Sequence, residues 1–248
     1  MNINNVNTDI YIGLNAGEEI YNTILNAKKS IAIVSPYLSA NYVDLLVQLQ
    51  EKGIDVTLLS NSDCVKGEGN QINILKKCIE QKQTLNEEAD ATRKKGILVV
   101  RGLILLLVLF NIFSVYDGSY SSLYSLFLLL ILLPLGSYYK SMKIFNYTYN
   151  YLLKPIFFAS YHEQGKRHKM QFFIHSKIFI IDDEVCFLGS ANFTLNAFRR
   201  NYESVIKITD KDKIDEIKNE ISNLPDREGT YTLDYDKIIP SIYMEPAN

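Results

Sequence analysis

The stretch "FIHSKIFIIDDEVCFLGSANFT", residues 173–194, decides both the fold of the chain and the place of its chemistry. His175 and Lys177 stand two residues apart in an apolar run that otherwise reads as a buried strand. Because side chains alternate between the two faces of a strand, both residues belong to the same face. The sequence therefore predicts a strand with a polar pair near its start.

The rest of this stretch predicts a hairpin. Asp182 and its neighbour make a turn, and residues 185–188 return as a second apolar strand that ends in a Gly-Ser-Ala-Asn sequence. A glycine at that point lets the backbone turn sharply. We expect the hairpin to bring Ser190 and Asn192 back beside His175 and Lys177.

This set of side chains is suited to attack on a phosphodiester. A neutral imidazole is a nucleophile near pH 7, a lysine neutralises a phosphoryl oxygen, and amide and hydroxyl groups donate hydrogen bonds to developing charge. Fixed cations and dipoles can do this without a metal. Taken alone, His175 is more typical of an ordinary core histidine and Lys177 of an edge lysine. Six specified residue types at fixed offsets, however, rarely arise by chance.

The spacing resembles the HKD motif of the phospholipase D superfamily, and every motif position is filled: His175, Lys177, Asp182, Gly189, Ser190 and Asn192. The following "RRNYES" also resembles the family, in which a glutamate supports the catalytic histidine; here it is Glu203. The resemblance covers residues 8–61 and 150–223. It implies an α/β fold with a mixed, largely parallel sheet flanked by helices.

The resemblance also implies a role for each residue. His175 forms a phosphohistidine, while Lys177 and Asn192 hold the phosphate. Ser190 adds a hydrogen bond, and Asp182 is mainly structural in the turn. Neither a cofactor nor a metal is implied.

The chain contains a single copy of the motif, whereas the implied mechanism needs one histidine to attack and another to protonate the leaving oxygen. His162 and His168 have no lysine two residues later, so we interpret them as loop residues. As in single-motif members of the family, we expect a twofold homodimer with a composite active site.

Outside the motif, apolar spacing predicts alternating helices and strands. "GEEIYNTILNAKKS" and "YVDLLVQLQEKG" read as helices that precede the apolar strands 31–38 and 54–59, an order typical of a parallel sheet. Helices are also expected over residues 67–95, at the start of the tyrosine-rich segment from residue 144, and over 211–224. A strand is expected over 204–208, and residues 156–159 form a short apolar run.

Two long apolar segments interrupt this pattern, at residues 97–115 and 123–139. Each is roughly long enough to cross a hydrocarbon core of about 30 Å as a helix. Lysines and arginines gather at their outer ends and are absent from the loop between them, which predicts a two-pass transmembrane hairpin with cytoplasmic ends. Arg101 lies about one turn inside the first segment. The alternative is a pair of helices buried in a soluble core, but the remaining chain is short for enclosing them.

The expected organisation has four parts. Residues 1–95 form the first part of the phospholipase D-like domain with a connecting helix, and 96–139 form the hairpin. Residues 140–223 form the second part with the motif, and 224–248 form a C-terminal tail.

The 248-residue chain has a net charge of −2, so it lacks the overall basic excess of a protein that coats nucleic acid. Three cysteines without CxxC spacing argue against a disulfide framework or a zinc ribbon. The N-terminus has no basic region followed by an apolar run, so no secretory signal is expected.

We therefore expect a membrane-anchored phosphodiesterase that hydrolyses phospholipid, with its catalytic domain in the cytoplasm. Two alternatives remain. A dimeric endonuclease would use the same site on DNA or RNA, helped by a basic loop with Lys166, Arg167 and Lys169. A catalytically silent membrane scaffold would keep the domain only for dimerisation, although a scaffold has no need of an intact motif.

Overall fold

The computed structural model describes residues 7–61, 72–118, 122–158, 173–227, 230–243 and 245. The chain divides into two units: Met1–Glu80 with Asn150–Tyr243, and Gln81–Tyr149 with Met244–Asn248. It leaves the first unit through β4 (Ile79–Leu85) and returns through β5 (Phe145–Tyr151), which pair as a two-stranded sheet. The two units are described separately below.

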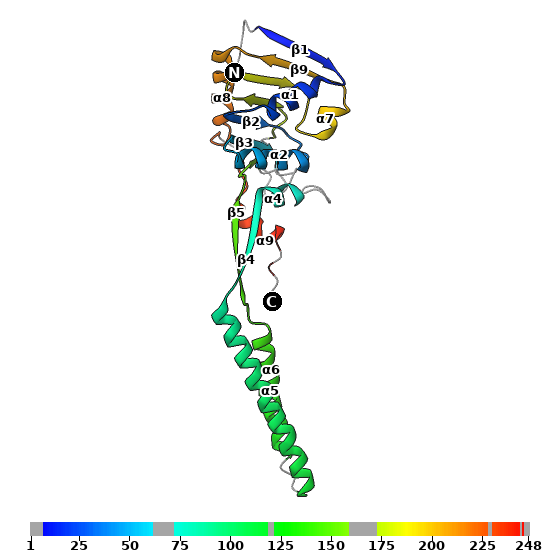
Figure 1. Cartoon of the computed structure of the whole chain (residues 1–248), viewed down its shortest axis with the longest axis vertical. Coiled ribbons are helices and arrows are strands. Elements are labelled where there is room, and N and C mark those ends of the chain that lie inside the picture. The colour runs from blue at the N-terminus through cyan, green and yellow to red at the C-terminus, as the bar shows by residue number, and fades with distance from the viewer. Residues whose placement is uncertain are drawn as a thin grey trace. The chain divides into compact units, whose positions relative to one another are not determined.

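A seven-stranded sheet forms the centre of the first unit (Figure 1). In spatial order its strands are β1 (Thr8–Gly13), β9 (Glu203–Ile208), β8 (Val185–Gly189), β7 (Ile178–Ile181), β2 (Ser30–Val34), β3 (Asp55–Asn61) and β6 (Ile156–Phe158). The helices of this unit are α1 (Ala16–Leu25), α2 (Ala40–Glu51), α4 (Ile72–Cys78), α7 (Leu195–Arg199), α8 (Lys211–Ser222) and α9 (Tyr235–Ile242).

The sheet is mixed, as expected, but the prediction that it is largely parallel is wrong. Only β2–β3 and β3–β6 are parallel among the described pairs of this sheet, whereas β1–β9, β9–β8, β8–β7 and β7–β2 are antiparallel. The strand-helix-strand spacing before residue 61 sets the direction of β2 and β3 only. The tight β7–β8 turn then forces an antiparallel pair, because a two-stranded hairpin cannot be parallel.

One face of the sheet packs against α8. Ile214, Ile217 and Ile221 lie on one stripe of this helix and are buried against Ile180 and Cys186 of the central strands. Burial of each such isoleucine contributes about 1.5–3 kcal/mol to folding. Burial also raises the pKa of the Cys186 thiol to about 12, which leaves it protonated and structural.

The other face carries an aromatic cluster beneath α1, α2 and α7. Its ring centroids lie 5.1–6.3 Å apart in tilted and edge-to-face arrangements, which are favourable for aromatic pairs. The members are Tyr21, Tyr42, Phe179, Phe193 and Phe198. The central strands β7 and β8 therefore have an apolar layer on each face of the sheet.

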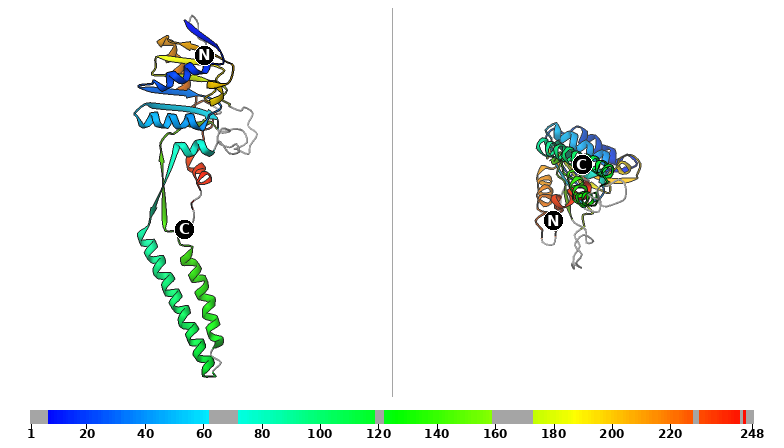
Figure 2. Two further views of the ribbon diagram at one scale, coloured as in Figure 1. Left: turned by 45° about the vertical axis from the view of Figure 1, so that its right-hand side comes forward. Right: turned by 90° about the horizontal axis from the view of Figure 1, so that it is seen from below.

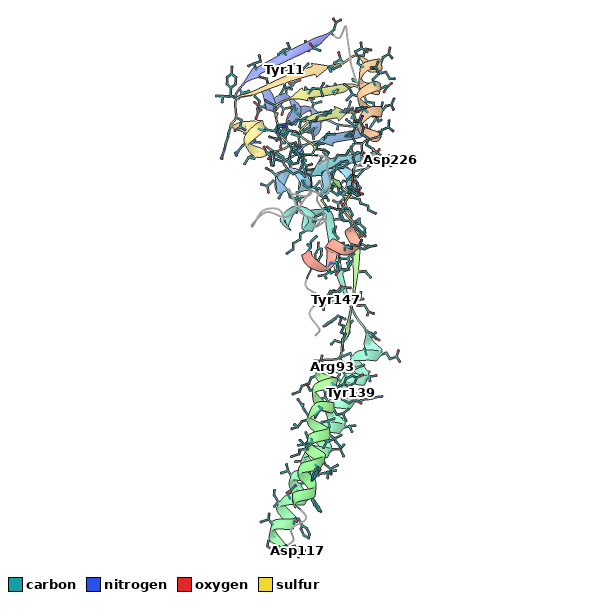
Figure 3. All side chains as sticks on the ribbon, turned by 180° about the vertical axis from the view of Figure 1, so that it is seen from behind. Tyr11, Arg93, Asp117, Tyr139, Tyr147 and Asp226 are labelled. Carbon is teal, nitrogen blue, oxygen red and sulfur yellow. The ribbon has the colours of Figure 1, made fainter. Side chains whose placement is uncertain are left out.

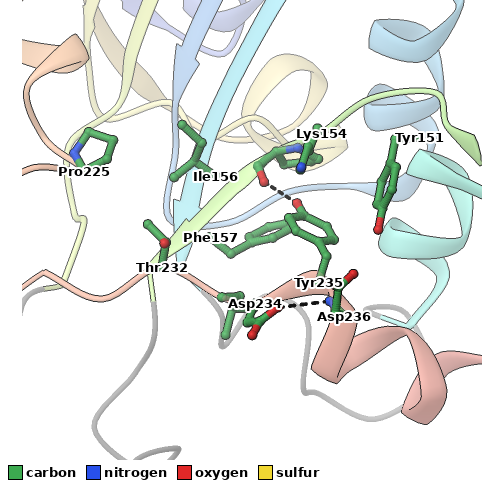
Figure 4. A pocket seen from close by; sticks show the side chains of 11 residues that line it. Tyr151, Lys154, Ile156, Phe157, Pro225, Thr232, Asp234, Tyr235 and Asp236 are labelled. Atoms are coloured by element: carbon green, nitrogen blue, oxygen red, sulfur yellow. Dashed lines mark hydrogen bonds between the residues drawn. The ribbon is translucent and has the colours of Figure 1, made fainter.

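Helix α9 lies within residues 224–248, for which the sequence predicts only a C-terminal tail. The Asp234 side chain caps it by accepting from the N–H of Asp236 at 3.1 Å, and the Tyr235 hydroxyl donates to the Pro155 carbonyl. These residues border a cavity of about 550 Å³, shown in Figure 4. The Lys154 ammonium lies over the rings of Tyr151 and Tyr235.

Two secondary-structure predictions at the border of the units are wrong. Residues 79–85 form β4 rather than the middle of a helix over 67–95, and residues 145–151 form β5 rather than the start of a helix. The segment "IEQKQTL" is mostly polar without alternation, and "FNYTYNY" is rich in strand-favouring tyrosine and phenylalanine. Helical and strand periods are hard to tell apart over seven residues.

The second unit contains an antiparallel pair of helices, α5 (Glu87–Tyr116) and α6 (Ser122–Lys140) (Figure 2). The Asn86 side chain accepts from the N–H of Ala89 and so caps α5. Arg93 and Tyr139 lie near one end of the pair and Asp117 at the other (Figure 3).

Most apolar side chains of the helix pair are exposed. An eighteen-residue window of α5 has a mean hydropathy of 2.5, yet only 11% of it is buried. A pair of core helices in a soluble domain would be mostly buried, so that alternative does not agree with the structure. Among the described residues, α5 is the one helix long and apolar enough by length and composition to cross a membrane, and Phe127–Lys140 of α6 is a shorter apolar stretch.

Candidate active site

His175 and Lys177 lie just before β7 rather than within it. The strand begins at Ile178, and the residues before it run extended; the N–H of Gly189 donates to the Lys177 carbonyl at 3.4 Å. The prediction that the polar pair sits inside a strand is therefore wrong by a few residues. The burial of these residues does not follow strand alternation, since Ile174 and Lys177 are buried whereas His175 and Ser176 are exposed.

The histidine and the lysine are in contact. The Lys177 Nζ atom donates to the His175 carbonyl at 2.6 Å and lies 3.4 Å from its ring nitrogen Nδ1. Lys177 is 8% exposed, and its burial lowers the pKa of the ammonium group, while the negative charge of Glu203 acts in the opposite direction. An exposed imidazole thus stands beside a largely desolvated cation.

Ser190 and Glu203 form the second contact of the site. The Ser190 hydroxyl donates to Glu203 Oε2 and accepts from the N–H of Ser204 at 3.0 Å. Asn201 Nδ2 donates to Glu203 Oε1 at 3.1 Å. Glu203 is therefore held by two side chains, and within the described part of the chain it shares no hydrogen bond with His175.

Gly189 brings the strands carrying these residues close together. A Cβ atom at this position would lie 2.1 Å from the Ser204 carbonyl oxygen and 3.0 Å from the Val205 Cα. Only a residue without a side chain permits this approach of β8 to β9. The glycine of the motif is thus explained by packing next to Ser190.

Asn192 stands at the same end of the sheet. Its Oδ1 atom is buried, and among the residues described here it has no hydrogen-bond partner. Native structures leave few buried polar atoms unpaired. Its carbonyl accepts from the N–H of Thr194 at 2.7 Å, which shapes the turn after β8.

Asp182 lies at the opposite end of β7 from the rest of the motif. Seven residues of extended chain separate it from His175, about 23 Å at roughly 3.3 Å per residue. Its carboxylate accepts the backbone N–H groups of Lys28, Lys29 and Ser30 at 2.6–3.0 Å. Burial alone would raise the pKa of Asp182, but these three donors prevail and lower it.

Two residues that the sequence reasoning missed hold the motif segments in place. Asn61 Nδ2 donates to the Ile174 carbonyl at 2.7 Å, and Asn61 Oδ1 accepts from the Ile174 N–H at 2.9 Å. The Ser35 hydroxyl accepts from the N–H of Phe193 at 2.9 Å. Their signal in the sequence is a polar residue at the end of a buried apolar run, "IAIVS" and "VTLLSN".

Some predicted features lie outside the described residues: His162, His168, Cys64 and the basic loop with Lys166, Arg167 and Lys169. Cys78 and Cys186 are buried. Within the described ranges, no group of three or more His, Cys, Asp and Glu side chains is arranged to hold a metal ion.

Sequence comparison places this site in a known family. The family described as "Cardiolipin synthase, PLD-like domain" matches residues 136–224, a range that contains the whole motif. The segment that carries the motif, residues 136–224, therefore belongs to the phospholipase D superfamily. Cardiolipin synthase A from Pseudomonas putida (strain W619) is 39% identical over 46 residues, which are 18% of this chain and 10% of that relative. The matched part thus spans only about a tenth of the curated relative.

Two solved structures are similar to the chain over most of its length. NucT from Helicobacter pylori matches with a TM-score of 0.50 and 15% identity, over 92% of this chain and all of that one. Nuc from Salmonella typhimurium, a phospholipase D family member, has a TM-score of 0.45 and 12% identity, over 91% and 99% of the two chains. At this identity, the likeness to NucT indicates the fold alone.

The phospholipase D domain of this chain therefore gathers an imidazole, an ammonium, a hydroxyl and an amide at one end of its sheet. An ammonium in a partly desolvated position attracts an anion more strongly than one in water. A tetrahedral phosphoryl group matches this set of a nucleophile with hydrogen-bond donors. Asp182 does not take part in this group.

Proposed function

We propose that the chain is a membrane-anchored phosphodiesterase that hydrolyses a phospholipid through a phosphohistidine on His175. The observation that carries the proposal is the contact between the exposed His175 ring and the buried Lys177 ammonium. Both residues lie in the segment that matches the cardiolipin synthase family. A nucleophile next to a fixed cation is what attack on an anionic phosphodiester requires.

In the proposed reaction, an unprotonated ring nitrogen of His175 attacks phosphorus, and the bond to the leaving alcohol oxygen breaks. Lys177 transfers its hydrogen bond from His175 to a phosphoryl oxygen, and Asn192 contributes its amide group. Water then attacks the phosphohistidine, breaks the phosphorus–nitrogen bond and restores the ring.

The leaving alcohol oxygen needs a proton from a second histidine, which takes a proton back from the attacking water in the second step. Because the motif occurs once in the chain, we propose that a second copy supplies this histidine in a twofold homodimer. Ser190 and Asn201 hold the carboxylate of Glu203, whose charge favours the protonated form of Lys177. Glu203 thereby supports the cation that the first step needs.

A lipid substrate is supported by the family description, by the curated relative and by the exposed apolar surface of α5 and α6. We propose that these two helices insert as a two-pass hairpin with the catalytic domain in the cytoplasm. Lysines and arginines stand near the Glu87 end of α5 and the Lys140 end of α6, which favours the cytoplasmic side for those ends.

The experiment offers the purified full chain three substrates in parallel, in the presence of a chelator: phospholipid vesicles, single-stranded DNA and RNA. We expect release of lipid headgroup by the wild type and its loss in His175→Ala. Ser176→Ala is the matched control, since this exposed neighbour is outside the motif and should leave the rate unchanged.

Cleavage of nucleic acid without headgroup release would replace the lipid proposal with the endonuclease alternative. Equal rates for the wild type and His175→Ala on all three substrates would leave only the scaffold alternative.

A further inference from the structure

A cavity of about 210 Å³ lies between α5 and α6 in the second unit. Val100, Leu132 and Gly136 form its apolar floor, and the first two are 3% and 8% exposed. Arg101, Ser137 and Lys140 add polar groups to its lining. An arginine and a lysine thus border one hollow in a helix pair whose other side chains are mostly apolar.

Close helix packing beside the cavity gives it a fixed shape. A Cβ atom on Gly96 would lie 2.3 Å from the Tyr139 ring, and one on Gly136 would lie 3.3 Å from Val100 Cγ1. Small residues let the helix backbones approach closely at these points. The larger side chains that follow along both helices then hold them apart around the cavity.

The charge around the cavity is positive. Within the described residues, its lining contains no carboxylate. Asp90, in the first turn of α5, pairs with Lys94 at 2.6 Å, and it lies about 16 Å along the axis from Arg101 at roughly 1.5 Å per residue. Asp90 is the acid of α5 nearest to Arg101 along the chain.

Arg93 extends the same positive face. It stands eight residues before Arg101, two helical turns away on the same side of α5. Its Nε atom is buried and has no hydrogen-bond partner among the residues that the structure describes. Figure 3 shows Arg93 and Tyr139 near the same end of the helix pair.

We propose that this cavity binds the phosphate of an anionic phospholipid headgroup. The proposal rests on the membrane anchoring proposed above, because the exposed apolar surface of the helices would then lie against acyl chains. Arg101 stands four residues, about 6 Å, inside the apolar segment that begins at Ile97, and its long side chain can carry the guanidinium back to the interface where lipid phosphates lie. A guanidinium binds two phosphate oxygens, while Lys140 adds a point charge and Ser137 a hydroxyl donor.

We expect the cavity to prefer lipids with an anionic headgroup because its lining has an excess of positive charge. A phosphatidylcholine headgroup carries its own cation, which Arg101 and Lys140 would repel. Phosphatidylglycerol carries the phosphate charge without that cation. Basic pockets between membrane helices on the cytoplasmic side are suited to such headgroups.

The test has two measurements on the purified full chain. Flotation with vesicles of phosphatidylcholine, or of an equimolar mixture with phosphatidylglycerol, measures anchoring. Native mass spectrometry in detergent then measures the retention of each lipid. We expect flotation with both vesicles and a preference for phosphatidylglycerol of roughly tenfold to thirtyfold, given about 1 kcal/mol per cation.

The double variant Arg101→Gln/Lys140→Gln should lose this preference and still float. Lys95→Gln/Lys143→Gln is the matched control, because it removes the same charge at the same end without touching the cavity lining. Arg101→Lys, which keeps the charge, should retain most of the preference. Circular dichroism of each variant verifies that the helices are formed.

The outcomes separate the two proposals. Absence of flotation from both vesicles overturns the anchoring. Flotation with equal retention of the two lipids, or an equal loss of preference in the control variant, overturns the headgroup site alone. Displacement of phosphatidylglycerol by an equal concentration of inorganic phosphate would assign the cavity to free phosphate and also overturn the lipid proposal.

Discussion

The side chain of Asn61 forms two hydrogen bonds with the main chain of Ile174, the residue that precedes His175. Asn61 is 2% exposed and ends β3, so a rigid strand of the sheet fixes the segment that carries the candidate nucleophile. Asn61 does not touch the proposed reacting atoms. We interpret it as a positioning residue.

Asn61→Asp keeps the acceptor for the Ile174 N–H but replaces the donor with a second acceptor. We expect a loss of about 1–3 kcal/mol in the free energy of unfolding, measured by urea denaturation. We also expect kcat to fall with KM nearly unchanged, since the substrate-binding groups remain. Thr57→Ala, at an exposed position on the same strand, should change neither. A loss of stability with unchanged kcat would give Asn61 a purely structural role.

A composite site predicts a specific result when two variants share a dimer. If wild type and His175→Ala are co-expressed in equal amounts, random pairing leaves about a quarter of the dimers with both histidines. Activity per total protein should therefore fall to about a quarter of the wild-type value. A site complete in each chain would retain about half, and that result would contradict the shared site.

The Asp182 turn predicts a pH dependence of stability. The folded pKa of Asp182 lies below its usual value of 3.8, so its contribution is present above that pH and is lost as the pH falls through the folded pKa. Asp182→Asn should cost about 1–3 kcal/mol at pH 7, because bonds from the three N–H donors lose their charge assistance. The gap between the two proteins should close in acid, as measured by urea denaturation across pH.

Asp183→Asn is the control for this turn. Both residues have positive φ, 57° and 59°, which asparagine tolerates, so backbone strain is matched. The Asp183 carboxylate pairs with Lys218 at 2.7 Å in a half-exposed position, and such pairs contribute about 0–1 kcal/mol. A larger loss in Asp183→Asn than in Asp182→Asn would contradict the assigned role.

Close contact of the two long helices predicts a difference between two glycines of α5. Gly96→Ala pushes a methyl group against the Tyr139 ring, whereas nothing lies within 4 Å of a Cβ atom on Gly102. We expect Gly96→Ala to lower the melting temperature of the helix pair in detergent, followed by circular dichroism. Gly102→Ala should leave it unchanged or raise it, since alanine favours helix by about 0.8–1.0 kcal/mol. Equal shifts would contradict the observed packing.

The motif and the helices α1, α2 and α8 could be predicted because their signals are local. The spacing from His175 to Asn192 and the apolar stripe of α8 are both contained in short segments. The antiparallel contact of β2 with β7 and the hydrogen bonds of Asn61 were not predictable in this way. Asn61 and Ile174 are 113 residues apart, and no local pattern encodes such a pairing.

The wrong helix predictions for β4 and β5 have a different cause. Neither strand has the apolar alternation of a strand that lies on a core, because their partner is only each other. The polar segment "IEQKQTL" therefore has no period that distinguishes a strand from an exposed helix. Pairing with a tyrosine-rich strand far along the chain decides its structure.

The long helices are inserted between strands of one sheet. Residues before the insertion supply β1, β2 and β3, and residues after it supply β6, β7, β8 and β9. Three ladders join the two groups of strands: β1–β9, β2–β7 and β3–β6. A single proteolytic cut in the insertion would therefore yield a nicked protein whose two fragments remain associated, with the motif on one fragment and Asn61 and Ser35 on the other.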